Sequence, residues 1–157
     1  MMKKIFALLL ILPLFSCVAQ TKKEKLYKSS IRGMERAGQN IPDNEFRKHL
    51  SLALEKLKTL SLDEMQEDKE EGFLSYKADD FTVYFDSYDL ACMKDALGYN
   101  VKTRLVFVVE GQFSFNAYLL ANRKKSFLIS FHKEEERILY KYVFDKNYSY
   151  EIVTVDI

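Results

Sequence analysis

Apolar and polar residues alternate through the C-terminal part of the chain, in residues 101–156: VKTRLVFVVEGQFSFNAYLLANRKKSFLISFHKEEERILYKYVFDKNYSYEIVTVD. A period of two indicates β-strands, and turn residues that recur roughly every 8–12 positions are typical of an antiparallel meander. The stretch therefore predicts five consecutive strands, at residues 101–109, 113–121, 126–133, 137–144 and 148–156.

The turns between these strands predict how neighbouring strands pair. We expect large apolar side chains to share one face, because a shift by one residue would move each of them to the other face. The expected cross-strand partners are Val109 with Phe113, Phe107 with Phe115, Leu105 with Ala117, Phe131 with Ile138, Ile129 with Tyr140, Tyr142 with Tyr150 and Phe144 with Tyr148.

Helical signals precede the strands. Apolar residues at helical spacing predict one helix that includes Tyr27 and ends at Gly38, and a second over residues 43–60. Ser61 and Glu64 match a capping box, which predicts a third helix that reaches Gly72. Further on, we expect short strands at residues 73–77 and 81–86 and a short helix at 89–97.

This order of elements predicts an α+β fold, in which N-terminal helices pack on a mainly antiparallel meander sheet. Over residues 40–157 the order also resembles the NTF2-like family, in which a curved sheet wraps a helix and leaves a conical pocket. The resemblance implies a cone-shaped sheet with a cavity. It also implies a possible pocket enzyme of the isomerase or hydratase type.

The first residues have the pattern of an export signal. Lys3 and Lys4 precede an apolar run over residues 5–15, which is the length of a signal peptide and too short for a membrane-spanning helix. The sequence Leu14-Phe15-Ser16-Cys17 resembles a bacterial lipobox, which implies a lipid on Cys17. The alternative is ordinary cleavage after Ala19.

The signal predicts the organisation and the location of the rest. We expect a signal peptide over residues 1–16, a tether over 17–29 and a single domain over 30–157. A lipid on Cys17 would anchor the protein to a membrane in the periplasm or at the outer membrane, whereas cleavage after Ala19 would secrete it. Cys92 then has no partner for a disulfide and is expected to be a buried hydrophobe.

Composition narrows the classes of partner. The chain has 24 basic and 23 acidic residues, and this near-neutral balance gives no footprint for nucleic acid. His49 and His132 lack the spacing of metal ligands, so neither a metal nor a cofactor is expected. Five aspartates could form a calcium site, although turn chemistry explains them as well. They are Asp79, Asp80, Asp86, Asp89 and Asp95.

Candidate site residues come from the predicted sheet. Tyr118, Tyr140, Tyr142 and Tyr150 could line a ligand pocket, or they could form the amphipathic surface of an ordinary sheet. An acidic run over residues 63–71 is either a docking patch or a solvated surface. For an enzyme, the candidate acid–base groups are Asp86, Asp89 and His132.

These observations favour a binding or interaction protein that takes a small apolar ligand or a partner protein of the cell envelope. Two alternatives stay open. One is an immunity-type protein that neutralises a toxin, and the other is the NTF2-like pocket enzyme.

Overall fold

The protein contains two long helices and one extended sheet. The computed structural model describes the backbone of residues 3–86, 89–90, 103–111, 113–121, 124–133 and 137–156, and the side chains of residues 22–86, 104–111, 113–121, 124–133 and 137–156. Its helices are α1 (Lys3–Asn40), α2 (Asn44–Thr59) and the single 3-10 turn η1 (Leu62–Glu64). Its strands are β1 (Gln66–Glu67), β2 (Leu74–Lys77), β3 (Phe81–Phe85), β4 (Asp89–Leu90), β5 (Thr103–Gly111), β6 (Ser114–Leu120), β7 (Lys125–Lys133), β8 (Ile138–Asp145) and β9 (Tyr150–Asp156).

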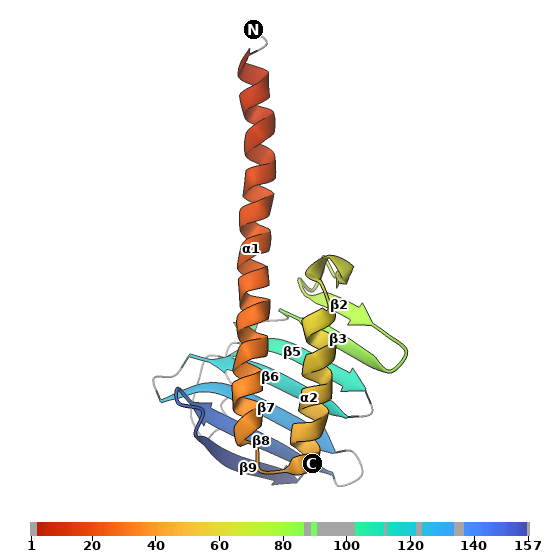
Figure 1. Cartoon of the computed structure of the whole chain (residues 1–157), viewed down its shortest axis with the longest axis vertical. Helices are drawn as coiled ribbons and strands as arrows, with labels where there is room; N and C mark the ends of the chain where they lie inside the picture. The colour runs from red at the N-terminus through yellow and green to blue at the C-terminus, as the bar shows by residue number, and fades with distance from the viewer. Residues whose placement is uncertain are drawn as a thin grey trace.

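Within the described residues the strands form one antiparallel sheet in the order β1-β2-β3-β5-β6-β7-β8-β9, with β4 paired to β5. The two helices lie next to each other across one face of this sheet, and the N-terminal part of α1 extends beyond it (Figure 1). The predicted α+β fold, with N-terminal helices on an antiparallel meander, is confirmed. In the part of the chain that the structure describes, no helix combines the length and the apolar character needed to cross a membrane.

The face of α1 that packs on the domain follows the predicted helical spacing. Tyr27, Ile31, Met34 and Ala37 are all buried in the core. Tyr27 thus belongs to the folded domain, although it lies inside the stretch assigned to a tether. The helix does not end at Gly38 as expected, because this glycine serves a close helix contact: a Cβ there would lie 2.9 Å from Cδ2 of Leu50.

Helix α2 forms where its sequence predicts it. Asp43 is the N-cap, and its carboxylate accepts hydrogen bonds from the backbone N–H groups of Glu45 (2.8 Å) and Phe46 (3.1 Å). These bonds satisfy two of the backbone donors that a helix leaves free at its start. The apolar face predicted for this helix is buried against α1 and the sheet, through Phe46, Leu50, Leu54 and Leu57.

The prediction of a third helix from Ser61 to Gly72 is wrong beyond the first turn. Ser61 and Glu64 do form the capping box, but the chain then continues as β1. The carboxylate of Asp68 accepts hydrogen bonds from the N–H groups of Glu70 and Glu71, at 3.0 and 2.9 Å, and so stabilises a turn. Residues 66–71 contain no apolar side chain that a helix could bury.

The prediction of a short helix at residues 89–97 is also wrong for its first two residues. Asp89–Leu90 form strand β4 and pair with β5. The continuation through residues 91–102 lies outside the described residues. Cys92 and Asp95 fall in that part, so the predictions made for them stay predictions.

Six of the seven predicted cross-strand pairs differ from the observed partners by two residues. The observed partners are Val109 with Phe115, Phe131 with Tyr140, and Phe144 with Tyr150. A shift by two leaves a side chain on its predicted face, so hydrophobic patterning cannot detect it. Leu105 is the exception: a bulge between Leu105 and Phe107 pairs it with Tyr118 instead of Ala117, and its side chain packs on the opposite face of the sheet. The register is selected instead by hydrogen bonds within the turns. At the last turn, for example, the Asp145 carboxylate accepts hydrogen bonds from two backbone N–H groups, those of Asn147 and Ser149.

The main core lies between the helices and the sheet and is rich in aromatic rings. The Phe46 ring of α2 stacks on Phe131 of β7, with centroids 4.6 Å apart, and contacts Tyr140 edge-on at 4.9 Å. A smaller apolar cluster occupies the opposite face of the sheet and consists of Tyr118, Leu120, Leu128 and Val143.

Candidate functional site

The four candidate pocket tyrosines do not lie together. Tyr140, Tyr142 and Tyr150 are on the face of the sheet that the helices cover, whereas Tyr118 belongs to the apolar cluster on the other face. Tyr142 is only 2% exposed, and its ring contacts Phe131 with centroids 5.8 Å apart. Its side chain therefore fills the core instead of lining a cavity.

The candidate acid–base groups are also separated. The Asp86 carboxylate accepts a hydrogen bond from Nε of Arg104 at 3.1 Å, which makes it an ion-pair partner. His132 pairs with Leu139 across the strands, on the face of the sheet away from the helices. His49 stacks on the Phe113 ring at 4.4 Å. The side chain of Asp89 lies outside the described residues.

Two of the aspartates around β3, Asp80 and Asp86, form ion pairs with basic side chains. The Lys56 ammonium forms an ion pair with Asp80, and this hydrogen bond holds the pKa of the Asp80 carboxyl below its ordinary value. Across the described side chains, no group of three or more His, Cys, Asp or Glu residues is placed to hold a metal ion.

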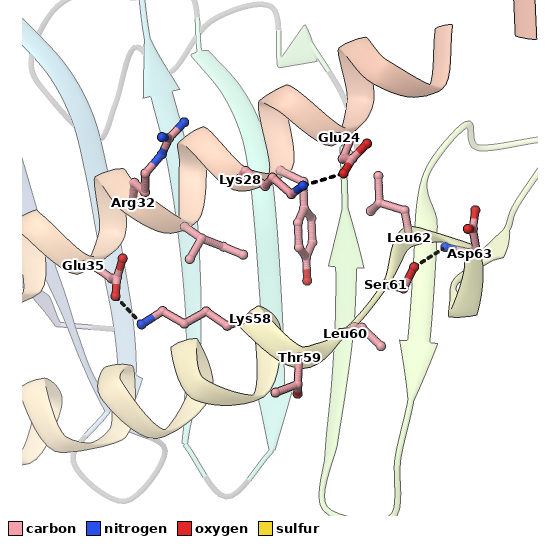
Figure 2. A pocket seen from close by; sticks show the side chains of 12 residues that line it. Glu24, Lys28, Arg32, Glu35, Lys58, Thr59, Leu60, Ser61, Leu62 and Asp63 are labelled. Atoms are coloured by element: carbon pink, nitrogen blue, oxygen red, sulfur yellow. Dashed lines mark hydrogen bonds and ion pairs between the residues drawn. The ribbon is translucent and has the colours of Figure 1, made fainter. Parts of the chain in front are cut away.

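A cavity of about 600 Å³ lies between α1 and the segment that follows α2 (Figure 2). Its floor is apolar and is formed by Tyr27 and Ile31 from α1 and by Leu60 and Leu62 from the end of α2 and η1. We call this cavity the α1–α2 groove. A smaller cavity of about 260 Å³ follows the same helix pair beside Gly38 and Leu50.

Tyr27 shapes the floor of the groove and does not offer its hydroxyl to a ligand. The hydroxyl donates a hydrogen bond of 2.7 Å to the backbone carbonyl of Leu57 and so joins the two helices. Burial, with a smaller effect of the Glu64 carboxylate, raises the pKa of this hydroxyl well above its ordinary value. The phenol is therefore neutral at physiological pH and contributes its ring to the apolar floor.

The rim of the groove carries three basic and three acidic side chains. Lys28 forms an ion pair with Glu24 at 2.5 Å, and Lys58 forms one with Glu35 (Figure 2). Arg32 is exposed and has no carboxylate partner among the described residues. Its side chain extends from the edge of the groove, on the side of α1 away from Lys58 and Leu60 (Figure 2), so its guanidinium can meet only an anionic group that reaches out of the groove.

Local patterns give little indication of this groove, because its residues come from α1, the end of α2 and η1, which are separate in the sequence. The groove arises from the way α1 packs beside α2, and no local pattern encodes that arrangement. The remaining signal was the apolar pair Leu60 and Leu62, which flank Ser61 of the capping box.

Comparisons with known proteins identify no relative from which the role of the groove could be transferred. No family model matches the chain, and no match was found to a curated protein or to a solved structure.

Proposed function

We propose that this chain is an exported binding protein, anchored through a lipid on Cys17, that holds an amphipathic anion in the α1–α2 groove. The single observation that carries the proposal is the groove itself. Its volume of about 600 Å³ falls within the range of small-molecule sites, which are mostly apolar and carry a few polar groups that orient the ligand.

The chemistry of the groove defines the class of ligand. The apolar floor, which includes Ile31 and Leu62, accepts a hydrocarbon chain, and burial of that chain is the main source of affinity. The guanidinium of Arg32, at the edge of the groove, can donate hydrogen bonds to a carboxylate or phosphate head group that extends out of the groove. The ligand therefore combines the apolar character expected from the sequence with a single anionic head group.

The binding test compares laurate with dodecyltrimethylammonium, which has the same chain length and the opposite charge. Calorimetric titration of residues 17–157 with Cys17→Ser, which lacks the apolar signal segment, should show binding of laurate and at least tenfold weaker binding of the cation. We expect Arg32→Glu to weaken laurate binding at least tenfold, because it removes the cation and adds a repelling charge.

Arg36→Glu is the matched control, since Arg36 is exposed on the same helix and does not line the groove. It should leave the affinity for laurate unchanged within twofold. Equal losses in the two variants, or equal binding of the two detergents, would show that the groove has no specific anion site.

The anchor is tested by the mass of the protein isolated from its native host. We expect a mass that lacks residues 1–16 and includes a lipid on Cys17, because the sequence before Cys17 resembles a lipobox. A chain that begins at Gln20 without lipid would support secretion after ordinary cleavage. A mass that includes Met1 would contradict export.

A further inference from the structure

One face of α1 carries a row of exposed basic side chains: Lys22, Lys25, Lys28, Arg32 and Arg36. Steps of three or four residues bring these positions onto one side of a helix, so the five charges form a continuous line. At 1.5 Å per residue the line is about 21 Å long. We call it the cationic stripe.

The stripe lies opposite the face of α1 that packs on the domain, where Tyr27, Ile31 and Met34 are buried. It therefore points away from the sheet into solvent. The domain cannot cover this surface without losing its own helix–sheet core, so any partner of the stripe comes from outside the folded unit.

Most charges of the stripe are not neutralised by the protein. Only Lys28 has an ion-pair partner within the described residues, and that partner is Glu24 at 2.5 Å. The second acidic residue of this part of the helix, Glu35, pairs with Lys58 of α2 and is thus already engaged. Because the whole chain is close to neutral, with a net charge of +1, the stripe is a local concentration of positive charge.

We propose that the cationic stripe docks the protein flat on an anionic lipid bilayer, with α1 along the surface and the sheet directed away from it. The proposal rests on the anchor at Cys17, which precedes the first stripe residue, Lys22, by only five positions in the same helix. An anchored chain therefore brings the start of the stripe directly to a membrane surface.

The energetics favour a lipid surface as the partner. Each basic residue near an anionic leaflet strengthens binding on the order of fivefold, and a lipid chain combined with a polybasic patch is a common pair of membrane signals. The stripe also forms part of the groove rim through Lys28 and Arg32. Flat docking thus turns this rim toward the bilayer, which is a source of amphipathic anions.

The test uses residues 17–157 with Cys17→Ser, so that neither a lipid nor the apolar signal segment contributes, and measures co-sedimentation with vesicles. Vesicles of phosphatidylcholine with about 30% phosphatidylglycerol, an anionic surface, should bind the protein at least tenfold more tightly than pure phosphatidylcholine. In about 0.5 M salt this preference should disappear, because the Debye length falls below 5 Å.

The variant Lys25→Glu/Arg36→Glu should lose at least tenfold in affinity for the anionic vesicles and nothing for the neutral ones. Its matched control is Arg47→Glu/Lys48→Glu, which makes the same change in net charge at exposed positions of α2. An equal loss in the control would overturn the proposal, because net charge alone would then explain binding. Binding to soluble polyphosphate without any preference for anionic vesicles would assign the stripe to an anionic polymer and would also overturn it.

The outcomes remain separable from those of the proposed function. The stripe variant replaces no residue that lines the groove, so its affinity for laurate should not change. Acylation at Cys17 is read from the mass of the native protein, and the vesicle test is made without a lipid on that residue. Failure of the membrane proposal would therefore change the vesicle result alone, and failure of the proposed function would change the laurate or mass result alone.

Discussion

Phe46→Ala should lower the free energy of unfolding by about 3–5 kcal/mol, which is the usual cost of deleting a fully buried phenylalanine ring. Phe46 has no exposed surface and joins α2 to the sheet through its stacked contact with Phe131 and its edge contact with Tyr140. A domain of this size is stable by only about 5–15 kcal/mol, so the variant should lose a large part of its stability. Urea unfolding followed by circular dichroism measures the change.

Leu52→Ala is the control on the same helix, because Leu52 is 48% exposed and lies outside the core. We expect a change within about 0.5 kcal/mol. If the two alanine variants were equally stable, α2 would not pack on the sheet as described, and the position of the groove would be wrong as well.

Local patterns in the sequence determine much of this fold. The period of two in residues 101–156 and the helical period in residues 43–60 each depend on near neighbours, and both predictions are confirmed. The predicted strand faces are also correct except at Leu105, because the hydrophobic core imposes them, and a bulge beside Leu105 moves this residue to the other face. Neighbouring residues of a strand point to opposite faces, so Tyr118 cannot share the face of Ala117, which was predicted to face the core. The grouping of Tyr118 with the other three tyrosines overlooked this alternation.

The features that were missed depend on interactions between distant segments or on turn chemistry. A register shift of two residues leaves the hydrophobic pattern unchanged, and the Asp145 turn selects one of the allowed registers. Gly38 resembles a helix end in sequence, but its contact with Leu50 depends on the position of α2. The groove has the same origin, since it exists only where α1 and the end of α2 lie side by side.

The proposed anchor, groove and cationic stripe all involve one helix, and this gives the two proposals a common geometry. The helix that contains Cys17 also supplies the groove residue Ile31 and the stripe residue Arg36. Arg32 belongs to both surfaces. A substitution at Arg32 should therefore change ligand and vesicle binding together, whereas substitutions at Arg36 or Lys25 should affect vesicle binding alone.

Alkaline pH should destabilise the protein strongly through Tyr142. Burial, together with weaker effects of Asp43, Tyr150 and Tyr140, raises the pKa of Tyr142 from 10.0 to about 12. The unfolded chain therefore loses this proton at a lower pH than the folded protein does. The stabilising effect is complete below pH 10 and is lost as the pH rises from 10 to 12. Tyr27, whose pKa is raised mainly by burial, acts in the same direction.

The size of the effect follows from the pKa values. One pKa unit corresponds to about 1.4 kcal/mol, so the raised pKa of Tyr142 lowers the free energy of unfolding by about 1.4 kcal/mol between pH 8 and pH 11. Urea unfolding at pH 8, 10 and 11 should show a falling free energy of unfolding, with a clearly smaller fall for Tyr142→Phe. Tyr84→Phe, on β3 and not among the groups that raise the pKa of Tyr142, should follow the parent protein. If Tyr142→Phe had the same pH dependence as the parent, Tyr142 would ionise as easily in the folded protein as in the unfolded chain, and the tight contact between α2 and the sheet around its ring would have to be rejected.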